Sequence, residues 1–406
     1  MSEMLLSSDT FESSLNVESA KAIAEAAKDR TRVHGLTHRH YKYPARFSPK
    51  FANSVIEHLT KPGDWVCDPF MGGGTVMVEA LALGRNAFGS DISTLSQFVT
   101  KAKLARPSIL AVKELNSWAQ NVDLYINMHN PTTRSDFYVD SGYQRNIDKK
   151  RHWRIRKGIE QALSSLDTLE HEPARVLARC AILRASQWAI DGRKSLVSLD
   201  MLRKKISQFA LQMGAESQAL HKLANSYVGK TQSHLYLSAA EDLTKLRLDK
   251  KHPAPKLILT SPPYPGVHVL YHRWQLEGGK ETPAPFWIAG EKDGSGISYY
   301  TMGGRGKAGL KTYYDRLFKS FTAISLLAND ETTIVQMLAF SEPSWQLPLY
   351  LQVMESCGLK EVLPWRHADE VDGRLWRDVP NGKWHANLQA KRKASKEVVL
   401  VHKLAN

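Results

Sequence analysis

Hydrophobic and polar positions in the first hundred residues predict an alternation of helices and strands. Apolar residues at three- and four-residue spacing over 50–59 predict an amphipathic helix, which a Pro-Gly pair ends. The short apolar run 65–67 predicts a strand, 76–83 predicts a helix closed by a glycine, and 87–91 predicts a second strand that ends in an acid. This succession is typical of one half of an α/β sheet.

The middle of the chain has a different pattern. Apolar residues recur with helical periodicity in four stretches, 110–118, 159–169, 174–188 and 199–213. Between the first two lies a dense basic stretch that contains a tryptophan, residues 143–157, and it is either a solvated helix face or a phosphate-contacting surface. We therefore expect a helical insertion into one domain.

The last part of the chain returns to alternating elements. The apolar run 257–260 predicts a buried strand, and a shorter strand that ends in acids precedes it at 234–242. Residues 264–309 are irregular, with aromatics and arginines that suit either base stacking or a packed loop. Beyond them the pattern predicts, in order, a helix at 312–327, a strand at 332–340, a helix at 348–357 and strand-like runs at 359–365 and 398–402.

These elements predict an α/β fold. We expect a mostly parallel twisted sheet with helices on both faces, a C-terminal antiparallel hairpin and a helical insertion. The chain then divides into four segments: a mobile or loosely docked lead-in at 1–30, one half of the core at 31–105, the insertion at 106–228 and the second half of the core at 229–406.

The net charge of the chain bears on its partner. Fifty-five lysines and arginines against 41 aspartates and glutamates give a formal net charge of +14, which favours a polyanionic partner such as a nucleic acid. No apolar run approaches the roughly 20 residues of a membrane span, and the first residues lack a signal-peptide pattern, so we expect a cytoplasmic protein without a membrane partner. Cys67, Cys180 and Cys357 lie far apart in apolar contexts and predict reduced core residues, without a metal site.

A glycine-rich loop follows the strand at 65–67. Its sequence is Asp68-Pro-Phe-Met-Gly-Gly-Gly-Thr75, and the second strand ends at Asp91. Glycines let a ligand approach the backbone, and an acid about 20 residues further on is placed to accept hydrogen bonds from ribose hydroxyls. A dinucleotide site uses the same logic, but an acid directly before the loop repels phosphate and favours a cation such as an amino group or a sulfonium. The pattern indicates a nucleotide-like cofactor with a positive charge.

The second candidate site is Thr260-Ser-Pro-Pro-Tyr264, at the end of the strand 257–260. Proline lacks an N–H and biases the residue before it toward extended backbone, so Ser261 and Pro262 should form a stiff ledge. The Ser261 hydroxyl and the Pro262 carbonyl can hydrogen-bond, and the Tyr264 ring offers a stacking surface. This combination suits a planar group with an exocyclic amine, and the alternative is a buried strand followed by a proline-rich turn.

Together the two motifs resemble those of the amino-methyltransferases of DNA, which methylate cytosine N4 or adenine N6 with S-adenosylmethionine. Tyr43-Pro-Ala-Arg-Phe-Ser-Pro49 resembles the segment that closes over the cofactor in this family, and Gly84-Arg-Asn-Ala-Phe-Gly-Ser-Asp91 also matches. The similarity covers residues 38–105 and 230–404. It implies a Rossmann-like methyltransferase fold and S-adenosylmethionine as the cofactor.

The resemblance also implies roles for individual residues. Asp242 would receive the adenine amino group of the cofactor, although a surface helix cap is the alternative. The implied catalytic residues are Ser261, Pro262, Pro263 and Tyr264. The full cofactor-binding set is Tyr43, Pro44, Ala45, Phe47, Asp68, Pro69, Phe70, Gly72, Gly73, Gly74, Thr75, Asp91, Ile92 and Asp242. From the two basic and aromatic segments we expect DNA contacts by Arg151, Arg154, Arg156, Arg273 and Arg305.

The resulting hypothesis is methyl transfer to the exocyclic amine of a base flipped out of double-stranded DNA. Cytosine N4 is preferred because the serine at position 261 resembles the cytosine-N4 members of the family. A role in restriction-modification, beside a separately acting nuclease, follows from the resemblance. The alternatives are N6-adenine DNA methylation, methylation of a base amine in RNA, and a catalytically silent DNA-binding protein. Either the insertion or the segment 264–309 is expected to recognise the DNA sequence.

Overall fold

The computed structural model describes residues 15–31, 33–43, 48–132, 136–227, 229–265, 273–294, 300–304, 306–366, 372–378 and 396–405. Its centre, within these ranges, is a sheet of eight strands. The strands are β1 (Trp65–Asp68), β2 (Asn86–Asp91), β3 (Ser233–Leu237), β4 (Leu257–Thr260), β7 (Thr333–Ala339), β8 (Leu359–Val362), β9 (Leu375–Asp378) and β10 (Lys396–Leu404).

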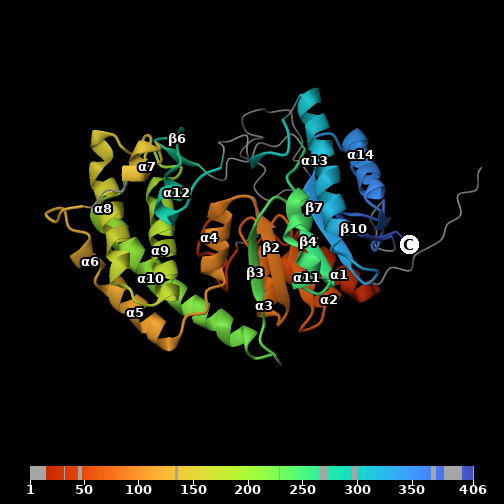
Figure 1. Cartoon of the computed structure of the whole chain (residues 1–406), viewed down its shortest axis with the longest axis horizontal. Coiled ribbons are helices and arrows are strands. Elements are labelled where there is room, and N and C mark those ends of the chain that lie inside the picture. Colours follow the sequence, from red (N-terminus) through yellow and green to blue (C-terminus); the bar gives the residue numbers. More distant parts are fainter. Residues whose placement is uncertain are drawn as a thin grey trace, which may run out of the picture.

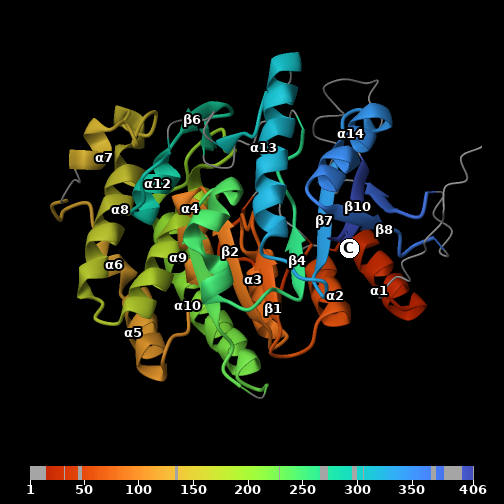
Figure 2. The ribbon, with the colours of Figure 1, turned by 45° about the vertical axis from the view of Figure 1, so that its right-hand side comes forward.

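The strand order in the sheet is β3-β2-β1-β4-β7-β10-β8, with β9 paired to β10. The pairs from β3 to β7 are parallel, whereas β10 is antiparallel to all three of its neighbours. Figure 2 shows β2, β1, β4, β7 and β10 following one another in this order. This topology confirms the predicted Rossmann-like methyltransferase fold. The C-terminal strands are antiparallel as predicted, but the sequence did not indicate β9, which lies between β8 and β10 along the chain.

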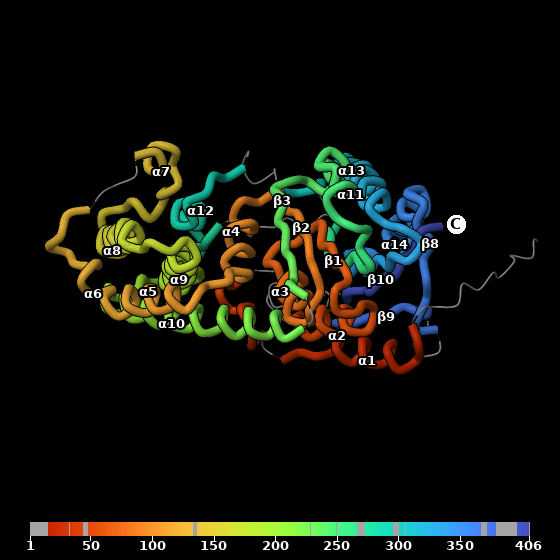
Figure 3. Tube along the Cα trace, turned by 60° about the horizontal axis from the view of Figure 1, so that its bottom comes forward, coloured from red at the N-terminus to blue at the C-terminus, as the bar shows by residue number. Residues whose placement is uncertain are grey.

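Side chains of the central strands alternate between two cores, because successive residues of a strand face opposite sides of the sheet. In β4, Leu257 and Leu259 pack into one core and Ile258 packs into the other. Figure 3 shows the helical layers that close these cores on opposite sides of the sheet. The first layer holds α1 (Val17–Lys28), α2 (Pro49–Leu59) and α3 (Thr75–Ala82), and the second holds α11 (Leu248–Lys251), α13 (Lys307–Ser325) and α14 (Pro343–Ser356).

Helix α1 differs from the expected lead-in, because it is packed on the sheet rather than loosely docked. The Asn16 side chain caps it by accepting a hydrogen bond from the N–H of Ser19 at 2.7 Å. Ile23 is buried, and the indole nitrogen of Trp365 donates to the carbonyl oxygen of Ala20 at 2.9 Å. This hydrogen bond joins residues that are 345 positions apart in the sequence, so the local sequence around α1 does not indicate it.

A helical lobe lies beside the sheet and corresponds to the predicted insertion (Figure 1). Its longest helix, α10, has 26 residues and so spans about 39 Å; Leu202 packs in the lobe and Leu220 in a core of the sheet. The apolar pattern predicts an end at residue 213, but α10 continues through Gly214, which packs closely on Leu115. No helix in the described ranges, α10 included, has the length and apolar character to cross a membrane. The helices of the lobe are α5 (Ile109–Gln120), α6 (Val122–Tyr125), α7 (Asp136–Asp140), α8 (Trp153–Ser164), α9 (Glu172–Ile190) and α10 (Leu199–Ala224).

Part of the segment 264–309 packs against this lobe. It contains the hairpin of β5 (Trp274–Leu276) and β6 (Lys280–Thr282), followed by α12 (Ala284–Ala289). Trp274 and Trp287 are buried in the core of the lobe, so of the two roles that the sequence left open for this segment, these two tryptophans have the packed one. Aromatic residues in an irregular stretch suit both roles, and packing decides between them.

Candidate active site

The two sequence motifs meet at the carboxyl ends of β1 and β4. Strand β1 lies between β2 and β4 in the sheet, and the chain progresses in opposite directions from these two central strands. Such a topological switch point is where open α/β sheets bind their ligands. The hydroxyl of Thr260, at the end of β4, donates a hydrogen bond to Oδ1 of Asp68, at the end of β1, at 2.7 Å. The glycine loop and the Ser-Pro-Pro-Tyr ledge therefore start from residues on neighbouring strands that are hydrogen-bonded to each other.

The glycine loop after β1 needs its glycines for two physical reasons. Gly72 and Gly74 have φ angles of 46° and 70°, in the left-handed region that side chains rarely adopt. A Cβ at Gly73 would lie 2.9 Å from the Cβ of Tyr43, so the loop and the segment before residue 44 are in close contact. Among the predicted cofactor residues, the structure thus brings Tyr43 against the loop.

Two carboxylates frame this loop. The N–H of Gly72 donates to Oδ2 of Asp91 at 2.9 Å, and the N–H of Ser93 donates to Oδ1 at 2.8 Å. Burial raises the pKa of Asp91, against the effect of these N–H donors. Burial also raises the pKa of Asp68 to about 7, although Thr260 and the N–H of Phe70 donate to it. Two acids whose pKa values are raised by desolvation favour a ligand that brings positive charge and hydroxyl donors.

Further residues support the loop from α4 (Thr94–Lys103) and α3. The side chain of Lys103 is fully buried, and its ammonium group donates to the carbonyl oxygen of Gly73 at 2.5 Å. The hydroxyl of Ser96 donates to the carbonyl oxygen of Gly72 at 2.5 Å. Among the described residues, the buried hydroxyl of Thr75 at the start of α3 has no hydrogen-bond partner. That hydroxyl and the first N–H groups of α3 could bind an anionic group of a ligand. Sequence reasoning missed Lys103, which continues the buried face of Leu95 and Val99 on α4.

The Ser-Pro-Pro-Tyr ledge is held by residues from three other elements. The hydroxyl of Ser261 donates to the carbonyl oxygen of Met337 on β7 at 2.9 Å. The hydroxyl of Tyr313 on α13 donates to the carbonyl oxygen of Pro263 at 3.0 Å, and the hydroxyl of Tyr264 donates to a carboxylate oxygen of Glu397 at 2.8 Å. Because the Ser261 proton points to β7, the oxygen of this hydroxyl can act only as an acceptor toward a ligand.

The segment that leads to Tyr43 is fixed to both the core and the lobe. The backbone of Lys42 forms two hydrogen bonds with the side chain of Gln187 on α9. The N–H of Lys42 donates to Oε1 of Gln187 at 3.2 Å, and Nε2 of Gln187 donates to the carbonyl oxygen of Lys42 at 2.9 Å. A nitrogen of His38 lies 2.6 Å from a carboxylate oxygen of Glu79 on α3. Pro44, Ala45 and Phe47, which complete the expected cofactor-closing segment, lie outside the described residues, and their role stays a prediction.

The positions of Asp242 and Ile92 give no direct support for a role in cofactor binding. Asp242 lies in the short 3-10 helix Ala240–Leu246 after β3 and forms an ion pair with Lys245 at 2.5 Å. The N–H of Ser238 donates to the carbonyl oxygen of Asp91 at 3.1 Å, so this helix starts close to the end of β2. Ile92 is half-buried against the core of the lobe. Roles for both residues in cofactor binding stay predictions.

Four of the five predicted DNA-binding arginines lie in the described ranges. Arg151 and Arg154 are exposed, and the guanidinium of Arg154 lies 5.3 Å from the ring centre of Trp153. Arg156 donates to the carbonyl oxygen of Asp148 at 2.7 Å. Arg273 pairs with Asp293, and its side chain is only 9% exposed, so the geometry does not favour a DNA contact there. Arg305 lies outside the described residues.

Comparisons with known proteins show that the first part of the chain is similar to DNA methyltransferases. A family model described as DNA methylase, for N6 and N4 methyltransferases, matches residues 11–100. The chain is 46% identical over 76 residues to the Type II methyltransferase M.MvaI of Kocuria varians, and 33% identical over 89 residues to the Type II methyltransferase M.MjaII of Methanocaldococcus jannaschii. These matches cover 18% and 22% of this chain, and 17% and 16% of those relatives. The chain thus spans about a sixth of the length of the relatives that it matches.

A solved structure is similar over a longer range but at low identity. It is the rRNA methyltransferase aviRa from Streptomyces viridochromogenes, with 11% sequence identity, a TM-score of 0.38 and coverage of 92% of this chain and 94% of that chain.

Proposed function

We propose that this chain, which belongs to the DNA amino-methyltransferase family, transfers a methyl group from S-adenosylmethionine to the exocyclic amine of a base in double-stranded DNA. The observation that carries the proposal is the hydrogen bond between Thr260 and Asp68, because it joins the loop suited to a cationic nucleotide-like cofactor to the ledge suited to an amine. The family match ends at residue 100, so the proposal for the ledge rests on its own residues and on the topology of the sheet.

The chemistry of the loop fits S-adenosylmethionine. This cofactor supplies a methyl group on a positively charged sulfur. The Asp68 carboxylate would attract the positive charge of the cofactor, and Asp91 would accept hydrogen bonds from its ribose hydroxyls. The hydroxyl of Thr75, at the start of α3, has no hydrogen-bond partner within the described part of the chain and is suited to the cofactor carboxylate. Tyr43, in contact with Gly73, would cover the cofactor from the other side.

The ledge would orient the target amine. Its nitrogen lone pair is delocalised into the base, so the nitrogen must turn toward tetrahedral geometry before it attacks a methyl group. The oxygen of Ser261, whose own proton is donated to Met337, would accept one amine hydrogen, and the Pro262 carbonyl would accept the other. These bonds favour the tetrahedral geometry as positive charge develops on the nitrogen. The sulfur would keep the electron pair of the broken S–C bond and leave as neutral S-adenosylhomocysteine, and the methylated nitrogen would then lose one proton to water. The Tyr264 ring would stack on a base turned out of the duplex.

Cytosine N4 is the preferred target within this proposal, because Ser261 resembles the residue of cytosine-N4 enzymes. A functional association with a restriction endonuclease, and the cytoplasm as the place of action, are parts of the same proposal. The net charge of +14 supports a nucleic-acid partner.

Mass analysis of nucleosides tests the function directly. The full chain is incubated with double-stranded DNA and methyl-labelled S-adenosylmethionine, and the DNA is then digested. We expect the label on deoxycytidine as N4-methyl. Label on deoxyadenosine would replace the preferred base and retain the mechanism. Label on RNA alone would move the function to RNA, and no transfer together with no cofactor binding would leave a silent DNA-binding protein.

The raised pKa of Asp68 predicts a pH dependence of cofactor binding. Asp68 must be ionised to attract a cation, and its pKa is about 7, so the dissociation constant should rise about tenfold from pH 8 to pH 6. The same pKa shift affects the stability of the cofactor-free protein. The folded chain keeps the proton on Asp68 up to about pH 7, whereas the unfolded chain keeps it only to about pH 4. The free energy of unfolding should therefore fall as the pH rises from about 4 to about 7.

Calorimetric titration with S-adenosylmethionine at several pH values measures this effect. Asp68→Asn is the matched control, since it keeps the shape of the side chain and removes the titration. Its cofactor affinity should be lower at pH 8 and should change less with pH. A wild-type affinity that is constant between pH 6 and pH 8 would argue against contact between Asp68 and the positive charge of the cofactor.

A further inference from the structure

We propose that Glu397 and Arg377 are positioning residues that hold the ring of Tyr264 in place for the target base. This inference rests on the proposed function, since it takes the Tyr264 ring to be the surface on which the base stacks. Neither residue belongs to a motif that the sequence singles out, and both come from the C-terminal strands, more than 110 positions after the ledge.

A chain of hydrogen bonds connects the three side chains. The hydroxyl of Tyr264 donates to Oε1 of Glu397 at 2.8 Å. Two nitrogens of the Arg377 guanidinium contact Oε2 of the same carboxylate. Nε donates a hydrogen bond to this oxygen at 2.7 Å, and Nη2 lies 2.6 Å from it. Glu397 on β10 and Arg377 on β9 are directly paired residues of the sheet. One carboxylate thus uses its two oxygens for two different partners.

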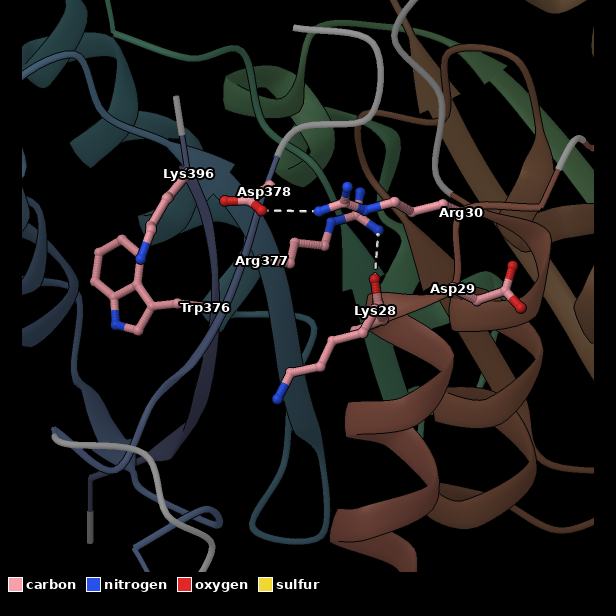
Figure 4. Close-up of a pocket in the computed structure, with 8 residues that line it drawn as sticks. Lys28, Asp29, Arg30, Trp376, Arg377, Asp378 and Lys396 are labelled. Atoms are coloured by element: carbon pink, nitrogen blue, oxygen red, sulfur yellow. Dashed lines mark hydrogen bonds and ion pairs between the residues drawn. The ribbon is translucent and has the colours of Figure 1, made fainter. Parts of the chain in front are cut away.

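The same guanidinium reaches helix α1. Its Nη1 atom donates to the carbonyl oxygen of Ala27, in the last turn of α1, at 3.1 Å. A cation is favoured at the carboxyl end of a helix. Figure 4 shows Arg377 extending from its strand toward this helix end, beside the ion pair of Arg30 with Asp378. The connection therefore runs from α1 through β9 and β10 to the ledge.

The burial of this pair favours a positioning role over a purely stabilising one. Glu397 is 7% exposed and Arg377 is 8% exposed, so both charges have lost most of their hydration. A buried ion pair regains that cost only with good geometry, and apolar residues of similar size often stabilise a fold as well. What apolar residues cannot supply is an acceptor for the Tyr264 hydroxyl. The hydrogen bond fixes the hydroxyl end of the ring and so limits its orientation.

The test compares four variants of the full chain in methyl transfer to DNA and in cofactor titration. Tyr264→Phe removes the hydroxyl and keeps the ring, Glu397→Gln breaks the ion pair, and the double variant combines them. Glu361→Gln is the matched control, because Glu361 forms a comparable two-bond pair with Arg374, at 2.7 Å for each bond, between β8 and the turn before β9. The control pair lies at the edge of the same sheet, on β8, which pairs with β10.

The expected result is a loss of about tenfold in kcat for Tyr264→Phe and for Glu397→Gln, with cofactor affinity within twofold of wild type. In the double variant, Glu397→Gln should cause no further loss, because its effect on turnover passes through the Tyr264 hydroxyl. The control should keep its turnover. Equal turnover of Glu397→Gln and the control, or fully independent losses in the double variant, would overturn the proposal.

Amide hydrogen exchange over residues 257–265 provides a readout that does not depend on activity. Faster exchange there in Glu397→Gln than in Glu361→Gln would support the positioning role even if the wild-type chain transferred no methyl group, in which case only the proposed function fails. Equal exchange would overturn the role. Should Glu397→Gln fail to fold, Tyr264→Phe decides: wild-type turnover in a folded Tyr264→Phe variant would refute the inference.

Discussion

Replacing Tyr264 by alanine should lower the turnover of methyl transfer by at least about a hundredfold, a loss of about 2.7 kcal/mol in transition-state stabilisation. Removal of the ring eliminates the stacking surface for the target base, worth about 1–3 kcal/mol, and also breaks the hydrogen bond to Glu397. The affinity for S-adenosylmethionine should stay within twofold, because the glycine loop and its two acids are unchanged. Single-turnover kinetics and calorimetry measure the two effects separately.

Ser261→Ala is the companion variant for the same ledge. It should also retain cofactor affinity and lose most turnover, since the oxygen that would accept the amine hydrogen is gone. Tyr264→Trp serves as the control for stacking and should retain more activity than Tyr264→Ala. A parallel loss of cofactor affinity in Tyr264→Ala and Ser261→Ala would contradict the separation of the ledge from the cofactor loop.

The second large effect is expected at Asp91. Asp91→Ala should weaken S-adenosylmethionine binding by about a hundredfold, because two charge-assisted hydrogen bonds to ribose hydroxyls contribute about 1.5–3 kcal/mol each when intact. The substitution also removes the acceptor for the N–H groups of Gly72 and Ser93, so the loop itself would lose its support. Turnover at saturating cofactor should recover substantially. Asp91→Asn keeps one oxygen acceptor and should show a smaller loss of affinity, whereas unchanged affinity in Asp91→Ala would exclude this residue from the cofactor site.

Short-range patterns predicted where the two motifs lie in the fold. Asp68 and Thr260 each end an apolar run of strand length, and parallel neighbouring strands place such ends at one edge of a sheet. The glycines at 72–74 and the acid at 91 have the spacing that a strand, loop, helix and strand impose. Local patterns were therefore sufficient for the fold class and for the meeting of the two motifs.

The parts that the sequence did not indicate depend on contacts between distant residues. Tyr313, Arg377 and Glu397 lie in ordinary-looking stretches, and they contact the ledge or its support only through the packing of α13, β9 and β10. Trp274 suits both a core and a stacking surface by its chemistry, and its burial follows from the position of the lobe. Such contacts need the relative placement of elements, which periodicity does not contain.

The position of β10 in the sheet has a consequence for how the protein is made. This strand follows the other seven in the sequence, yet it fills the gap between β7 and β8. While a ribosome is still adding it, β7 has one open edge to which foreign strands can pair. The growing polypeptide should therefore be prone to aggregation until β10 emerges. Glu397 belongs to β10, so the closed edge of the sheet and the hydrogen-bond acceptor of Tyr264 should form in the same step.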